Sequence, residues 1–142
     1  MVEFLIKKRA AVNKATTDGR GFTPLLEAAW TGNEKVVKLL VEEGHAEVDQ
    51  CSKNMGTAPL FLAALKGHES VVRLLIKHKA DVNLWQESTG CRPLYIAAHK
   101  GHEAVVRVLV KAGAGVNQLT RKIGWSPIFG ASMNGHTSTV AV

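Results

Sequence analysis

Histidine is the residue type in this chain that is best suited to metal or acid–base chemistry. Three of the six histidines, His68, His102 and His136, recur every 34 residues, each directly after a glycine. Side chains at the same place in neighbouring packed units lie about 8–10 Å apart, whereas a metal ion needs its ligands about 2 Å from its centre. We therefore expect these histidines to be structural residues at helix starts, and we expect no metal site.

The sequence also lacks the other patterns that carry catalysis. It has no glycine-rich phosphate loop, no nucleophile elbow and no metal-ligand spacing. Two cysteines, Cys51 and Cys91, form no disulfide framework, which favours reduced thiols in an intracellular protein. The apolar runs are only a few residues long, so no membrane span is predicted. We expect a protein that is not an enzyme and that binds no cofactor.

The recurring histidines belong to a longer repeat. Prolines spaced by 35, 34 and 34 residues are each followed, eight residues later, by a glycine: Pro24, Pro59, Pro93 and Pro127, then Gly32, Gly67, Gly101 and Gly135. One fixed period of this size is typical of a solenoid of stacked supersecondary units. The period divides a single domain, residues 1–142, into a partial repeat (1–17), three repeats (18–52, 53–86 and 87–120) and a truncated repeat (121–142).

Each repeat is expected to form two antiparallel helices. In the first complete repeat, Thr23 can cap a helix that starts at Pro24 and ends at Gly32. A second helix with an apolar stripe follows and ends at Gly44, and one extra residue after it explains the spacing of 35.

Three positions depart from the favoured residue at a helix end. Lys79 stands where Gly113 ends the outer helix of the next repeat, which predicts a left-handed lysine at a cost of about 1–2 kcal/mol. Ala58 and Arg92 stand where Thr23 caps its helix, at a cost of about 1 kcal/mol each. We expect the stacked core to absorb these costs.

Several motifs recur in phase with the period. They are Thr23-Pro24-Leu25-Leu26-Glu27-Ala28-Ala29 with its equivalents at Pro59 and Pro93, Gly67-His68 and Gly101-His102, and Ala80-Asp81-Val82-Asn83. Together they resemble the ankyrin repeat, and the resemblance covers essentially the whole chain. It implies an all-α ankyrin-repeat solenoid of stacked β-turn/helix-turn-helix units. The motif histidine of the family is replaced by Leu26, Phe61, Tyr95 and Phe129, which predicts apolar packing at that position.

The resemblance implies protein–protein interaction through a concave groove, where finger turns and inner helices meet a partner. The candidate partner-binding residues stand two before, six after or seven after each proline, or at finger tips: Arg20, Phe22, Trp30, Thr31, Asn54, Met55, Thr57, Leu65, Lys66, Cys91, His99, Lys100, Trp125, Met133 and Asn134. Large aromatic side chains are favoured anchors, so Trp30, Phe22 and Trp125 come first. The alternative is that each packs on a neighbouring finger. Trp85 is expected to pack under its turn.

The charges bear on the class of partner. The chain has 18 basic and 12 acidic residues, a formal net charge of +6. Lys66 and Lys100 share one line on the inner helices and favour a protein with an acidic segment, although they could equally be two solvated lysines. The other basic residues fall beside acidic ones on the outer helices, which weakens the case for nucleic acid.

Two other functions stay open on the sequence. One is polyanion binding, to RNA or acidic lipid headgroups, and the other is a regulatory arm of a larger enzyme or channel. The chain begins inside one repeat and stops inside another, and solenoids normally end in polar capping repeats. We expect a fragment of a longer array, with end-to-end self-association through uncapped ends as a possible property.

Overall fold

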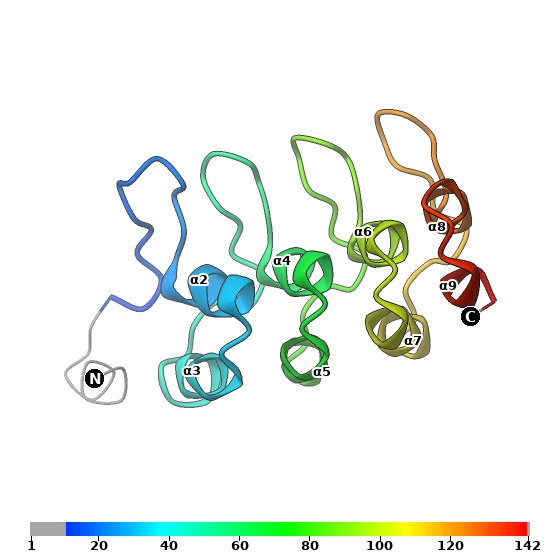
Figure 1. The fold of residues 1–142 in the computed structure, drawn as a ribbon. Coiled ribbons are helices and arrows are strands. Elements are labelled where there is room, and N and C mark those ends of the chain that lie inside the picture. The colour runs from blue at the N-terminus through cyan, green and yellow to red at the C-terminus, as the bar shows by residue number, and fades with distance from the viewer. Residues whose placement is uncertain (1–10, 142) are drawn as a thin grey trace.

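The computed structural model describes residues 11–141, which form a row of stacked units, each with a finger, an inner helix and an outer helix (Figure 1). The inner helices are α2 (Pro24–Thr31), α4 (Pro59–Lys66), α6 (Pro93–Lys100) and α8 (Pro127–Met133). The outer helices are α3 (Glu34–Lys38), which continues as η1 (Leu39–Glu43), then α5 (Glu69–Lys77), α7 (Glu103–Lys111) and α9 (Thr137–Val140). The described residues contain no strand, so the all-α fold is confirmed. The partial repeat predicted at the start falls largely on residues 1–10, outside the described part.

The helix ends follow the sequence closely. The side chains of Thr23 and Ser126 each accept a hydrogen bond from the backbone N–H three residues on, as an N-cap does. Ala58 and Arg92 make no such bond. Lys79 is left-handed, with φ 70°. All three predicted departures are therefore present in the fold.

The extra residue of the first complete repeat lies inside the outer helix. After α3 the backbone widens into the π-helical η1, where the Gly44 N–H bonds to the Leu39 carbonyl at 3.0 Å. Gly44 stays right-handed with φ −84°, and His45 takes the left-handed position with φ 52°. The helix ends before Gly44 as predicted, but placing the extra residue after it was wrong. The spacing of the repeats shows that one residue has been inserted, but it does not show at which point of the repeat the residue lies.

Small residues on the inner helices and β-branched residues on the outer ones fill the core. Ala63 and Ala97 are fully buried on α4 and α6, so these two helices approach closely. Val71 and Val105 are buried on α5 and α7 in the same cluster. This continuous apolar layer fixes the order of the inner helices and hence the surface they share with the fingers.

Polar contacts staple each repeat to the next. The His68 Nε2 donates to the Trp30 carbonyl at 3.1 Å, and the His102 Nε2 donates to the Leu65 carbonyl at 3.0 Å. Both histidines stand at outer-helix starts, as expected. At the other end of the repeat, the Asn83 side chain accepts from the backbone of Gly115 at 3.0 Å.

The fingers also touch one another. At each step a backbone hydrogen bond joins neighbouring fingers: Lys53 N–H to Gly21, Glu87 N–H to Gly56 and Arg121 N–H to Gly90, at 3.4, 3.4 and 3.0 Å. The fingers therefore form a row joined by hydrogen bonds, and Figure 1 shows this row on the side of the inner helices that faces away from the outer helices.

Candidate functional site

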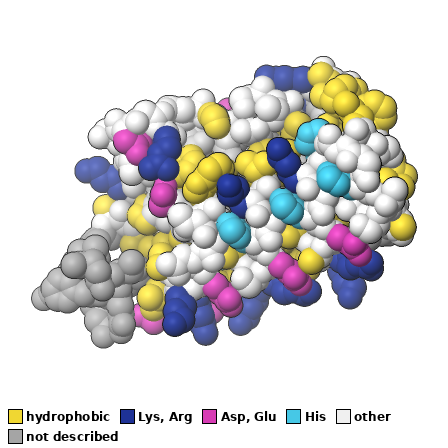
Figure 2. All heavy atoms as spheres, in the orientation of Figure 1, with side chains coloured by type: hydrophobic (Ala, Val, Ile, Leu, Met, Phe, Trp, Pro, Cys, Tyr) yellow, Lys and Arg dark blue, Asp and Glu magenta, His cyan; other side chains and the backbone are white. Residues whose placement is uncertain are grey.

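A hollow of about 400 Å³ lies between the first two complete fingers and helices α2 and α4. Seven of its lining residues are among those predicted from the sequence: Arg20, Phe22, Trp30, Asn54, Met55, Thr57 and Leu65. Figure 2 shows apolar side chains gathered between the fingers and the inner helices, with basic side chains beside them. We call this space the hollow.

Trp30 stands at the mouth of the hollow, near the end of α2, with 37% of its surface exposed. The Lys66 ammonium lies 4.6 Å from the centroid of its ring, in cation–π geometry. The His68 bond to the Trp30 carbonyl fixes the backbone below. Trp30 is therefore held from two sides and still open to solvent, which suits an interface anchor.

The floor of the hollow is apolar, and one of its edges is formed by an uncharged methionine. Phe61 and Leu62 are buried on α4, and Leu65 is half-buried one turn further along. Met55, at the tip of the second finger, is 47% exposed. An unbranched, polarisable methionine adapts its shape to what it contacts.

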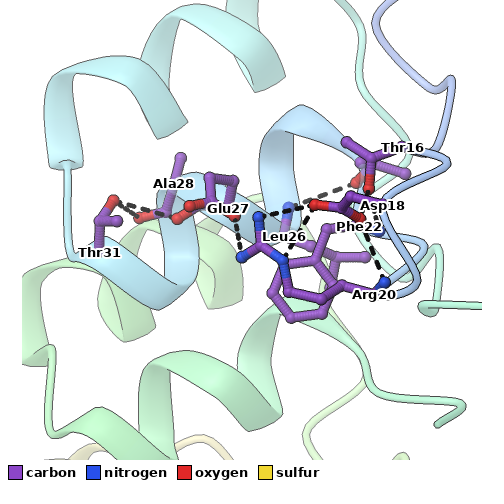
Figure 3. A network of polar contacts seen from close by, with 9 residues as sticks. Thr16, Asp18, Arg20, Phe22, Leu26, Glu27, Ala28 and Thr31 are labelled. Atoms are coloured by element: carbon purple, nitrogen blue, oxygen red, sulfur yellow. Dashed lines mark hydrogen bonds and ion pairs between the residues drawn. The ribbon is translucent and has the colours of Figure 1, made fainter. Parts of the chain in front are cut away.

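Arg20 closes the other edge of the hollow with a charge that is balanced locally (Figure 3). Its guanidinium pairs with Asp18 at 3.0 Å and with Glu27 at 2.9 Å, and lies 5.1 Å from the centroid of the Phe22 ring. Hydrogen bonds to the Asp18 carboxylate, from the Thr16 hydroxyl first and then from the Arg20 backbone and side chain, lower the pKa of Asp18 to about 2.

Three predicted contact residues are buried. Phe22, Thr57 and Cys91 stand two residues before a proline, and their exposed fractions are 7%, 1% and 8%. The prediction that this register projects from the surface is wrong for them, because adjacent fingers pack against each other there. The Thr57 hydroxyl accepts a hydrogen bond from the buried Gln86 of the next finger at 2.9 Å. Phe22 and Thr57 form part of the buried wall of the hollow.

The remaining predicted residues lie along the later repeats. His99 stacks on Tyr95 with ring centroids 5.8 Å apart, and the Asn134 amide donates to the His99 carbonyl at 2.8 Å. Trp125 is half-buried against Phe129, 5.1 Å between centroids. Lys100, Met133 and Thr31 are exposed, and Thr31 bonds back to its own helix. These residues lie outside the hollow.

Some structural features escaped sequence reasoning. Phe61, Leu62 and Gln86 line the hollow but stand at positions that were assigned to packing or to none. Trp85 does not pack under its turn. Its ring is partly exposed between two guanidinium groups, those of Arg121 at 4.2 Å and Arg92 at 5.6 Å. Arg92 follows Trp85 in the same finger and Arg121 lies in the next finger, about one repeat on, and this placement was the signal that could have shown the arrangement.

The architecture and the repeated contacts point to one family, and comparison with family models agrees. A model described as ankyrin repeats (3 copies) matches residues 1–86 and again residues 41–120. The chain belongs to the ankyrin-repeat family. A search of curated proteins gave no match to this chain.

Ankyrin repeats are protein–protein interaction modules and are typically non-catalytic. At the position of the family's motif histidine, the side chains of Leu26, Phe61 and Tyr95 are buried, as expected of apolar packing. Phe129, at the same position of the last repeat, is exposed. Burial raises the pKa of the Tyr95 hydroxyl.

Two further findings concern residues 11–141 of this ankyrin array. Their histidine, cysteine and acidic side chains nowhere gather in a group that could hold a metal ion. Over the same range there is no helix with the length and apolarity that crossing a membrane requires.

Proposed function

We propose that this ankyrin array binds a protein partner on the face formed by its fingers and inner helices, with the hollow as the main anchor site. The supporting observation is the open Trp30 at the mouth of an apolar hollow of about 400 Å³. Aromatic side chains held rigidly beside such spaces contribute strongly to binding, because little conformational freedom is lost when the partner docks.

The charge distribution supports a protein partner over a polyanion. On the outer helices Arg73 pairs with Glu69 at 2.7 Å and Arg107 pairs with Glu103 at 2.6 Å, which neutralises part of the basic surface. Nucleic acid binding draws its affinity from many phosphate contacts. The apolar hollow offers a phosphate chain nothing, whereas it suits an apolar side chain of a protein.

A capture experiment tests this function. The chain is used as bait in a cell extract beside a Trp30→Ala/Lys66→Glu/Lys100→Glu variant and a Lys77→Glu/Lys111→Glu control on the outer helices. Circular dichroism verifies that all three are folded. We expect a protein that the parent and the control capture and the variant does not, at low and moderate salt.

Equal capture by all three chains would refute the assignment of the binding face. Material that nuclease digests, or that modest salt releases, would instead favour polyanion binding.

A further inference from the structure

Two lysines extend the hollow along the row of inner helices. Lys66 ends α4 and Lys100 ends α6, and both are exposed. Among residues 11–141 neither lysine lies within ion-pair distance of an acidic side chain. The equivalent residues of the first complete repeat and of the last repeat, Thr31 and Asn134, are uncharged. The free positive charge on this line is therefore confined to the two middle repeats.

On the opposite side of the hollow, the charged side chain among the described lining residues is that of Arg20, and it is paired. Arg20 faces two carboxylates, Asp18 and Glu27, so these three side chains together have a net charge of −1 (one guanidinium against two carboxylates). The low pKa of Asp18 keeps its carboxylate ionised throughout the physiological range. The hollow thus lies between the paired Arg20 at the first finger and a positive line that starts at Lys66.

The distance between neighbouring repeats determines how far apart two acidic groups of a ligand must be to reach both lysines. Packed helices lie about 8–10 Å apart. An extended peptide in the polyproline II conformation advances about 3.1 Å per residue with three residues per turn, so side chains three apart lie on the same side of it. A peptide running along the row of inner helices therefore gains about three residues per repeat. A carboxylate opposite Lys66 would be followed by one opposite Lys100 three residues later.

We infer that the hollow and the two lysines together bind an extended peptide segment of a partner protein. One bulky apolar side chain of that segment enters the hollow, and two acidic residues three positions apart follow it toward α6. The volume of about 400 Å³ is within the range of about 300–1,000 Å³ of small-ligand pockets, so it admits a large side chain. This inference rests on the proposed function and adds the chemistry of the partner.

Selection from a random peptide library displayed on phage tests the inference. Peptides of about twelve residues are long enough to cross three repeats. The bait is the whole chain, beside Trp30→Ala, Lys66→Glu/Lys100→Glu and, as the matched control, Lys77→Glu/Lys111→Glu. The control lysines are also exposed, also end helices of neighbouring repeats and also stand 34 residues apart, so both double variants change helix ends in the same way.

We expect enriched peptides in which an apolar residue precedes two acidic residues three apart. A synthetic peptide of that pattern should bind the parent and the control equally in fluorescence polarisation. Its affinity should fall by about tenfold in Lys66→Glu/Lys100→Glu, the sum of two modest surface pairs, and by more in Trp30→Ala.

Each other outcome has a distinct meaning. Peptides that need Trp30 but lack the acidic pattern overturn the inference and leave the proposed function standing. Peptides that bind all variants alike overturn both. A library that yields no enriched peptide overturns an extended peptide as the occupant, and the capture experiment then decides the proposed function separately. Displacement of the synthetic peptide by polyuridylate at low salt overturns the inference in favour of a polyanion.

Discussion

Gly67, the glycine that ends α4, should tolerate alanine less well than Gly113, the left-handed glycine that follows α7. Gly67 and Gly113 are both left-handed, with φ 74° and 91°, so alanine costs about 1–2 kcal/mol at either site. At Gly67 an added Cβ would also lie 2.6 Å from the Nδ1 of His102, whereas at Gly113 no atom lies within 4 Å. The ring cannot easily retreat, because its Nε2 is bonded to the Leu65 carbonyl.

Forcing a methyl group into such a contact costs about a further 1–3 kcal/mol. We therefore expect Gly113→Ala to lower the free energy of unfolding by about 1–2 kcal/mol and Gly67→Ala by about 2–5 kcal/mol, measured by urea denaturation and circular dichroism. Equal losses in the two variants would refute the reasoning.

A double-mutant cycle identifies the cause. In a His102→Ala background the ring is gone, so Gly67→Ala should cost no more than Gly113→Ala does. The expected coupling is about 1–3 kcal/mol. If the full penalty persists without the ring, the contact with His102 is not its source.

Two other predictions concern the fingers and the outer helices. Lys79→Gly should raise the free energy of unfolding by about 0.5–1 kcal/mol, since it relieves a left-handed side chain but adds freedom to the unfolded chain. The matched change Lys77→Gly, in right-handed helix α5, should lower it by about 0.5–1 kcal/mol, and the same sign for both would contradict the argument. The carboxyl of Asp18 should titrate near pH 2 in a ¹³C NMR experiment, and a midpoint near 4 would show that its hydrogen bonds do not form in solution. Because the folded pKa is lowered, its contribution to stability is present above about pH 4 and is lost as the pH falls toward 2; Asp18→Asn should remove that part of the pH dependence.

Local features of the fold could be predicted because single residues decide them. Pro24 and Gly32 mark the two ends of α2, and an uncapped Ala58 or a left-handed Lys79 follows from comparing equivalent positions in phase. The π-helical turn before Gly44 could not be predicted, since the spacing of the repeats is the same wherever the extra residue is inserted.

The binding surface was harder to predict because it depends on how the fingers lean on one another. The register that contains Thr57 and Cys91 faces the neighbouring finger once the fingers are joined edge to edge, and it therefore becomes buried. Phe61 reaches the hollow although its register belongs to the packing positions. Trp30 and Met55, in contrast, stand at positions that vary between repeats and do not form part of the core, and both side chains are exposed.

The histidine staple between the first two repeats has a consequence for stability. His68 belongs to the second repeat, yet it holds the carbonyl of Trp30 in the first, and the hollow is built from both. The hollow is therefore formed at the interface between two repeats and is absent from either repeat alone. In a stack where each unit contacts only its neighbours, a partner seated in the hollow would hold these two repeats together and so add to the stability of the row at that junction.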